Sequence, residues 1–475
     1  MYNPRLPPTG APHPARSSQV DQNFRRSLSL TDGTLLVAGG IIGSGIFLTT
    51  GVMAASLPSP LLLLAVWLAA GGISLLGALA FGELGAMMPS AGGPYVYLRE
   101  AYGEGAGFFY GWIMLVAGQS GSIAALAAGF AEYLGVLAPK LGVERIVFSP
   151  QLLGWHGTIS AGQIAGVACI VALSAANYIG LRWGAWVQNL STAAKLAALA
   201  ALVLLGAWLG RGDWRHLAPA AGGPLPHHLG GVLLTALIGG LWAYDGWIYL
   251  TYVGAEIRHP ERNLSRSLIY GILIVACIYI ACNVLYFYAL PITRLAGVTR
   301  VAFAAVSALL GPSAAGAIAA LIMLSCFGAM NAGILSGARI YVPMAADGQF
   351  FRVLARVHPR RHTPGPSLAI QAFWASVLTL SGRYDQLFTY VIFIMTMAYM
   401  ASVAGLFVLR RKRPEWPRPY RCIGYPYVPA VYLLITAVFA GNMVLTRPGE
   451  TGAGLALVAL GLPVYLLFRR GAAAA

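Results

Sequence analysis

Two features of the sequence could do chemistry in an apolar environment, and the first is a serine between two glycines. Gly43, Ser44 and Gly45 lie in the run 39–47, GGIIGSGIF, inside a hydrophobic stretch at about 35–52. Each glycine in a helix interior lowers helix stability by about 1 kcal/mol relative to alanine. Where the helix is interrupted, lipid provides no water to form hydrogen bonds with the exposed N–H and C=O groups. The run predicts either a broken helix, whose second half starts near Gly45 and points its amides at an anion, or close helix packing through small residues.

The second feature is Lys195, which lies within an apolar segment. The chain uses arginine almost everywhere, and its only other lysines are Lys140 and Lys412. A compact, titratable ammonium in such a segment indicates a functional role, and the alternative is a long side chain that reaches the membrane surface. The expected membrane boundary near Arg182 and Trp183 is roughly 20 Å away along a helix, which is too far for that reach.

A second apolar run repeats the glycine pattern. Residues 239–247, GGLWAYDGW, carry a Gly-Gly pair 200 residues after the first pair. Two interrupted helices in matching positions predict a transporter built from inverted repeats. Asp245 is expected to cap the second half-helix, with a binding-site carboxylate as the alternative. Trp242 and Tyr244 are aromatic side chains that either close over a substrate or belong to the packed core.

The elements that hold these residues follow from the composition. Of 475 residues, 58% are hydrophobic and 10% are charged, whereas soluble proteins average about 25% charged. Apolar runs of about twenty residues recur along the chain and predict an all-α polytopic membrane protein. Twelve spans are expected, at approximately residues 32–57, 61–88, 105–137, 161–180, 185–209, 231–254, 265–290, 302–343, 366–382, 385–409, 427–446 and 452–468.

These spans predict the domain organisation. Residues 1–28 are expected to form a disordered tail, 29–209 and 231–409 two inverted repeats of five spans each, and 427–470 the last two spans. Most of the 31 Lys and Arg residues fall in loops on the side of the N-terminus, which predicts that both termini are cytoplasmic. The net charge of +16 therefore belongs to membrane loops and does not indicate a nucleic-acid partner.

Histidine and cysteine placement argues against other classes. Intramembrane metal catalysis needs His and carboxylate ligands within the spans, but all 8 histidines fall in tails or loops, so neither a metal nor a cofactor is expected. Cys422 lies on the cytoplasmic side and the other cysteines lie within spans, so no disulfide-linked accessory subunit is expected. Glu83, at the end of the second span, is expected to pair with a loop arginine, with a gating role as the alternative.

Several motifs together resemble the amino acid-polyamine-organocation superfamily, and most closely its L-type amino acid transporter branch. They follow the family order from residue 31 to about residue 415. The matching stretches are 43–47 (GSGIF), 83–85 (ELG) through 100–103 (EAYG), 195–196 (KL), 243–247 (AYDGW), 325–328 (SCFG) and 409–415 (LRRKRPE).

The resemblance implies a LeuT-like fold, a 5+5 inverted repeat in which helices 1 and 6 are discontinuous, and an amino acid as substrate. The substrate carboxylate would lie on the amides of residues 43–45 and its ammonium on carbonyls of both breaks. Trp242 takes the position of an aromatic gate, and Phe393 would line the side-chain pocket. The substrate-binding residues implied are Ile41, Ile42, Gly43, Ser44, Gly45, Trp242, Ala243, Tyr244, Asp245, Gly246 and Phe393.

The resemblance also implies transport without sodium. Lys195 would stand where sodium-coupled relatives bind an ion, and Ala329 would replace a hydroxyl side chain near it on span 8. The expected function is amino acid exchange across a bacterial inner membrane, with proton-coupled symport and a non-transporting sensor as alternatives. The indole of Trp242 favours small neutral substrates, while aromatic and branched ones stay open, as do cationic ones because of Asp245. The loop 138–160 lacks the cysteine by which animal members join an accessory glycoprotein.

Overall fold

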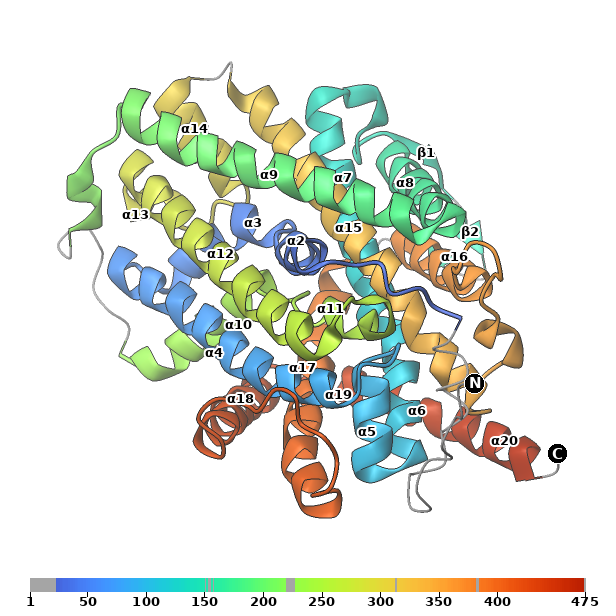
Figure 1. Cartoon of the computed structure of the whole chain (residues 1–475). Helices are drawn as coiled ribbons and strands as arrows, with labels where there is room; N and C mark the ends of the chain where they lie inside the picture. The colour runs from blue at the N-terminus through green and yellow to red at the C-terminus, as the bar shows by residue number, and fades with distance from the viewer. Residues whose placement is uncertain are drawn as a thin grey trace, which may run out of the picture.

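The computed structural model describes residues 23–149, 151–152, 155–156, 158–218, 227–311, 314–381 and 384–473. Helices dominate this part of the chain (Figure 1). Within it, 10 helical stretches are long and apolar enough to cross a membrane, and two shorter apolar helices accompany them. The chain is therefore a helical multi-pass membrane protein, as predicted, although the count of twelve spans stays a prediction. Most of the predicted N-terminal tail lies outside the described residues.

The first half of the chain forms helices α2 to α9 and two short antiparallel strand pairs. The helices are α2 (Leu30–Ile41), α3 (Gly45–Ser56), α4 (Pro60–Met87), α5 (Pro94–Tyr102), α6 (Glu104–Ile113), α7 (Gln119–Leu137), α8 (Ala161–Ile179) and α9 (Leu181–Leu209). A π-helical turn, Met114–Gly118, joins α6 to α7. In the loop before α8, β1 (Ile146–Phe148) pairs with β4 (Ile159–Ser160), and β2 (Gln151–Leu152) pairs with β3 (Trp155–His156).

The second half of the chain forms helices α10 to α20. They are α10 (Leu229–Ala243), α11 (Tyr249–Tyr252), α12 (Pro260–Ala289), α13 (Ile292–Leu295), α14 (Val301–Leu310), α15 (Ala315–Ala346), α16 (Gly365–Ser381), α17 (Tyr384–Lys412), α18 (Tyr427–Thr446), α19 (Pro448–Ala459) and α20 (Gly461–Ala473). The span predicted over 302–343 is thus two helices, α14 and α15. Gly311 ends α14 with a φ of 89°, a left-handed conformation that glycine adopts without strain.

Both predicted helix breaks are present. Residues 42–44 between α2 and α3 are not helical, and neither are residues 244–248 between α10 and α11. In Figure 1, α2 is seen end-on near the centre of the molecule, where it packs against α9, α12 and α15, while α3 packs against α10. The two breaks therefore lie inside the helix bundle, away from lipid.

The start of α2 is fixed by a capping box and by a short backbone pairing. Ser29 Oγ accepts the N–H of Asp32, and the Asp32 carboxylate accepts the N–H of Ser29, so two groups that the helix leaves unpaired are satisfied. The preceding residue, Leu28, donates its N–H to the carbonyl of Glu256 and accepts the N–H of Arg258. We call this pairing the 28–257 bridge, because Leu28 and Ile257 are its facing residues.

Glu83 pairs with loop and helix-end arginines, as expected. Arg410 donates two hydrogen bonds to the fully buried Glu83 carboxylate, at 2.9 and 2.6 Å, and the Cys422 N–H donates a third at 2.6 Å. Arg418 lies 3.5 Å from the same carboxylate. The pairing joins α4 to the end of α17 and the loop that follows, and satisfies a charge that would be costly to bury alone.

Candidate functional site

The two breaks contact each other directly through glycine backbone. Gly246 has a φ of 101°, and a Cβ there would lie 2.6 Å from the carbonyl oxygen of Gly40. A Cβ on Gly45 would lie 2.7 Å from the Cα of Ala243. Only glycine permits these approaches, so the runs 39–47 and 239–247 combine a broken helix with close packing of small residues.

Lys195 lies against the end of the first half-helix. Its Nζ donates hydrogen bonds to the carbonyl oxygens of Gly39 (2.8 Å), Ile42 (2.7 Å) and Ser325 (3.3 Å). The side chain is fully buried and does not reach a membrane surface. The last carbonyls of a helix lack intrahelical partners and carry partial negative charge, so the ammonium of Lys195 satisfies the end of α2.

Ser325, not Ala329, supplies the hydroxyl near Lys195. Ser325 Oγ donates to the carbonyls of Ile42 (3.0 Å) and Gly43 (2.9 Å). Ala329 lies one turn further along α15, where its methyl group would be 3.7 Å from a Cβ on Gly43. That Ala329 replaces a hydroxyl of relatives stays a prediction, and Ser325, one turn before it on the same helix face, places a hydroxyl at the end of α2.

A tyrosine hydroxyl that no sequence motif marks joins the two breaks. Tyr279 of α12 donates to the carbonyl of Ile41 at 3.1 Å and to that of Ala243 at 2.9 Å. These carbonyls end α2 and α10 respectively. A carbonyl oxygen has two lone pairs, and that of Ile41 also accepts the N–H of Gly43, so the Ala243 carbonyl is the one of the two that can still accept a hydrogen bond from a ligand.

The breaks enclose a small cavity of about 30 Å³, which we call the central cavity. Seven of the eleven predicted binding residues line it, and Gly40, Ser122, Leu126 and Tyr249 complete its wall. The seven are Ile41, Gly43, Ser44, Gly45, Trp242, Ala243 and Asp245.

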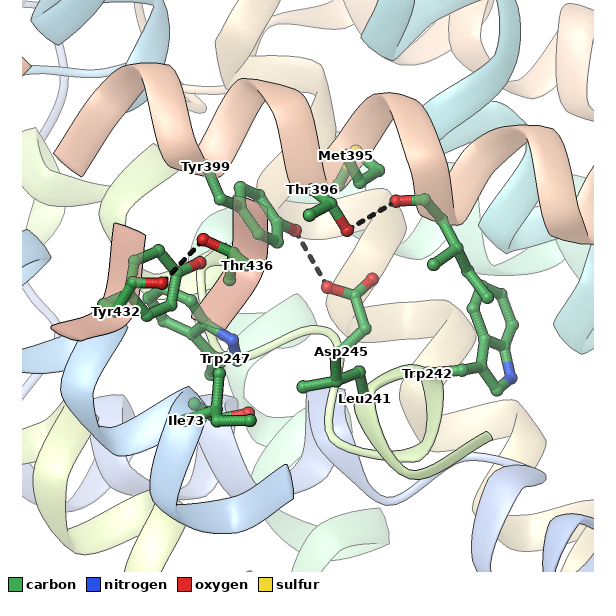
Figure 2. A pocket seen from close by; sticks show the side chains of 12 residues that line it. Ile73, Leu241, Trp242, Asp245, Trp247, Met395, Thr396, Tyr399, Tyr432 and Thr436 are labelled. Carbon is green, nitrogen blue, oxygen red and sulfur yellow. Dashed lines mark hydrogen bonds between the residues drawn. The ribbon is translucent and has the colours of Figure 1, made fainter. Parts of the chain in front are cut away.

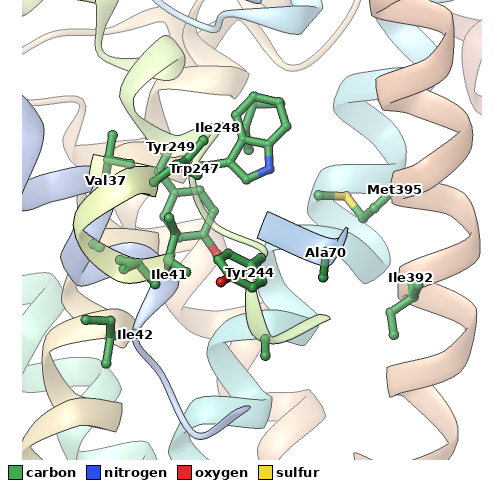
Figure 3. Close-up of a cluster of buried hydrophobic side chains, with 14 of the residues drawn as sticks. Val37, Ile41, Ile42, Ala70, Tyr244, Trp247, Ile248, Tyr249, Ile392 and Met395 are labelled. Carbon is green, nitrogen blue, oxygen red and sulfur yellow. The ribbon is translucent and has the colours of Figure 1, made fainter. Parts of the chain in front are cut away.

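The chain between the half-helices presents backbone groups to this cavity. The N–H of Gly43 already donates to the Ile41 carbonyl at 2.8 Å, whereas the first N–H groups of α3, which begins at Gly45, have no intrahelical acceptor. Figure 3 shows the side chains of Ile41 and Ile42 within a cluster of buried hydrophobic side chains. The side chains of these two residues therefore pack in the core, while the Ile41 carbonyl accepts from Tyr279 and the Ile42 carbonyl from Lys195.

Tyr244 and Gly246 lie beside the central cavity without lining it. The Tyr244 ring is fully buried, with its centroid 5.1 Å from that of Tyr279 and 6.1 Å from that of Trp67. Tyr244 thus belongs to the packed core, one of the two alternatives for this residue. Gly246 contributes its backbone conformation at the break.

A second cavity, the side cavity, opens on the other side of Asp245 and Trp242. Figure 2 shows these two side chains beside the helix that carries Thr396 and Tyr399. Phe393 is buried on that helix but does not line the side cavity. Its lining residues are Ile73, Ser74, Leu241, Trp242, Asp245, Trp247, Ile392, Met395, Thr396, Tyr399, Tyr432 and Thr436.

Asp245 does not cap the second half-helix, contrary to the prediction. The short helix α11 begins at Tyr249 with Ile248 in the capping position and without a side-chain cap. The Asp245 carboxylate instead accepts a hydrogen bond of 2.8 Å from the hydroxyl of Tyr399 (Figure 2). Because Asp245 lines both the central and the side cavity, it is placed to meet a ligand.

A third and larger cavity, of about 340 Å³, lies between α3 and α10. We call it the α3–α10 cavity. Ser44, Gly45 and Trp242 line both this cavity and the central cavity. The indole of Trp242 thus lies between the α3–α10 cavity and the central cavity.

On the opposite side, where α2 begins, two ion pairs connect neighbouring elements. Arg339 donates to both carboxylate oxygens of Glu256, at 3.2 and 3.1 Å, and both side chains are 1% exposed. Burial raises the pKa of Glu256, although the guanidinium of Arg339 opposes this shift. Arg99 pairs with Asp347 in a second contact on this side. These ion pairs connect α15 and the residue that follows it to α5 and to the segment after α11.

Comparison with known proteins identifies the family. The family model described as amino acid permease matches residues 28–465. The chain belongs to the amino acid permease family. The permease is 30% identical to the serine/threonine exchanger SteT of Bacillus subtilis over 448 residues, which cover 94% of this chain and 97% of the relative.

Animal transporters are similar to the permease over the same region. The large neutral amino acids transporter small subunit 2 of Homo sapiens is 32% identical over 446 residues, 94% of this chain and 80% of the relative. The b(0,+)-type amino acid transporter 1 of Homo sapiens is 31% identical over 418 residues, 88% of this chain and 82% of the relative. The five cysteines of the permease are free thiols.

Proposed function

We propose that this permease exchanges amino acids across the plasma membrane by alternating access and without sodium. The observation that carries the proposal is the ammonium of Lys195, which occupies the carbonyls of Gly39 and Ile42 at the end of α2. A fixed cation satisfies this helix end, and a second cation beside it would be repelled at low dielectric. The name of the SteT relative, a serine/threonine exchanger, supports exchange.

The substrate is proposed to bind as a zwitterion between the two breaks. Its carboxylate would lie on the free amides at the start of α3, near Ser44 and Gly45, because a helix N-terminus attracts an anion. Its ammonium would lie near the carbonyls of Ile41 and Ala243, where α2 and α10 end. The partial negative charge at the ends of both helices and the lone pair that remains on the Ala243 carbonyl support this assignment.

The architecture supports two inverted repeats, residues 29–209 and 231–409, followed by the spans within 427–470. Each proposed repeat begins with a broken helix, α2–α3 in the first and α10–α11 in the second. The excess of basic residues in loops on the side where α2 begins supports cytoplasmic termini. In that orientation the α3–α10 cavity opens to the outside. The free thiols lie in helices or on the cytoplasmic side, which supports action without a disulfide-linked accessory subunit.

Transport in proteoliposomes tests the proposed function. Uptake of labelled serine is expected to require an amino acid inside the vesicles and to be unchanged when potassium replaces sodium. Uptake into amino acid-free vesicles driven by a pH gradient would instead identify a proton-coupled symporter. Strict sodium dependence would contradict the role given to Lys195. Binding of amino acids without any flux would indicate a sensor.

The polar side chains of the side cavity support a preference for small substrates that form side-chain hydrogen bonds. Asp245 and Thr396 lie beside the indole of Trp242 (Figure 2), which leaves little room for a large substrate. A hydroxyl on the substrate can donate to the Asp245 carboxylate. A hydrogen bond to a charged group contributes about 1.5–3 kcal/mol.

Asp245→Ala is therefore expected to reduce the preference for serine over alanine by about tenfold. Competition by unlabelled serine and alanine against labelled substrate measures this preference. Tyr399→Phe is the matched control, since it removes the hydroxyl that contacts Asp245 and keeps the carboxylate. It should retain the preference for serine. An unchanged preference in Asp245→Ala would show that this carboxylate does not contact the substrate side chain.

A further inference from the structure

Side-chain amides join three neighbouring helices, α8, α9 and α15 (Figure 1). Asn177 Nδ2 of α8 donates to Asn331 Oδ1 of α15 at 2.8 Å. Asn331 Nδ2 donates to Gln188 Oε1 of α9 at 3.0 Å and to the Gly184 carbonyl at 3.2 Å. Gln188 Nε2 donates in turn to Thr192 Oγ1 at 3.1 Å. We call these four residues, each at most 2% exposed, the amide network: Asn177, Asn331, Gln188 and Thr192.

The amide network lies between glycines that bring the three helices close together. A Cβ on Gly184 would lie 2.2 Å from Asn177 Oδ1. A Cβ on Gly328, one turn before Asn331 on α15, would lie 3.2 Å from Lys195 Nζ. Apolar contacts between such surfaces are non-directional, whereas hydrogen bonds between buried polar side chains select one register. The network therefore fixes how α9 and α15 are aligned beside Lys195.

The last members of the amide network contact α2 at Gly39. A Cβ on Gly39 would lie 2.1 Å from Thr192 Oγ1 and 2.2 Å from Gln188 Nε2, so both groups pack against the backbone there. The carbonyl of Gly39 accepts the hydrogen bond from Lys195 Nζ at 2.8 Å. Gln188, Thr192 and Lys195 follow one another at spacings of four and three residues, which places them on one face of α9. The network thus borders both partners of this hydrogen bond.

Stability alone does not account for a polar network inside a membrane protein. Hydrogen bonds between side chains of membrane helices contribute little on average, and buried polar groups can often be replaced by apolar groups of similar volume without loss of stability. Positional precision does account for it. Lys195 Nζ must reach carbonyls of two different helices, those of Ile42 at the end of α2 and Ser325 in α15.

We propose that Asn331 is a positioning residue that acts through Lys195, by holding α8 and α9 in register with α15. This inference rests on the proposed function. Asn331 is the member of the amide network that bonds to both other helices. It is not among the described residues that line the central cavity, so its effect on exchange must be transmitted by Lys195 and the end of α2.

The test compares exchange in proteoliposomes, normalised to folded protein, in the wild-type and Lys195→Met backgrounds. Asn331→Leu keeps a similar volume and is expected to reduce wild-type exchange by about threefold to tenfold, as for members of one network. In Lys195→Met it should reduce the remaining exchange by less than about twofold, because coupled effects do not add. Gln188→Met breaks the same hydrogen bond from α9 and should behave alike, so the inference is tested even if Asn331→Leu does not fold.

Gln371→Leu is the matched control. Gln371 of α16 is also a fully buried amide that bonds to α15, since its Nε2 donates to the Ile334 carbonyl at 3.3 Å. Any effect of this change should be the same factor in both backgrounds. The inference is overturned if folded Asn331→Leu exchanges normally, or if it loses the same factor with and without Lys195. A wild-type protein that transports no amino acid would overturn the proposed function, and the inference with it.

Discussion

Lys195→Met is expected to reduce amino acid exchange by at least about tenfold. The methionine fills a similar volume but leaves the carbonyls of Gly39 and Ile42 without their cation. Each hydrogen bond from a charged donor contributes about 1.5–3 kcal/mol, and both carbonyls lie at the end of α2, directly beside the central cavity. The end of α2 should therefore lose the geometry that presents its backbone to the substrate.

The measurement is exchange in proteoliposomes, normalised to the amount of folded protein from size-exclusion chromatography in detergent. Lys412→Gln is the control, because Lys412 also donates to a backbone carbonyl, that of Ala101, but outside the central site. It should keep activity close to that of the wild type. A folded Lys195→Met variant with normal exchange would remove Lys195 from the mechanism.

Gly246→Ala is expected to destabilise the protein by about 3 kcal/mol or more and to abolish transport. The φ of 101° costs a non-glycine residue about 1–3 kcal/mol, and the new Cβ would lie 2.6 Å from the Gly40 carbonyl oxygen and 2.8 Å from its carbon. Both atoms are backbone, so no flexible side chain can move away. The change should push the two broken helices apart at their point of contact.

Thermal unfolding in detergent, together with exchange activity, measures this effect. Gly72→Ala is the matched control, since Gly72 also lies in a membrane helix but a Cβ there meets no atom within 4 Å. It should be neutral or slightly stabilising, because alanine favours a helix over glycine. Equal melting temperatures for the two variants would contradict the proposed contact between the breaks.

The features that could be predicted from the sequence are those with a local signal. Glycine pairs within apolar runs marked both breaks, and a lysine within a third run marked the contact with the end of α2. Asp245 was misassigned because Gly246 turns the chain and α11 starts only at Tyr249. The order of residues alone does not show where helical geometry resumes after such a turn.

Contacts between distant segments could not be predicted. Tyr279 donates to Ile41, 238 residues earlier in the chain, and nothing in its own neighbourhood marks it among 23 tyrosines. The Ser325 carbonyl accepts a hydrogen bond from Lys195 because this face of α15 packs against α2 and α9. Arg447 likewise becomes part of a cavity only when the turn after α18 folds beside α3 and α10.

The 28–257 bridge has a mechanical consequence. It fastens the segment that leads into α2 to the segment that follows α11, through main-chain hydrogen bonds of 2.8 to 3.0 Å. If α2 moves during transport, the segment that follows α11 should move with it. Main-chain hydrogen bonds, unlike side-chain contacts, cannot adjust by rotation of a side chain. A state in which only one of the two segments has moved would require these hydrogen bonds to break.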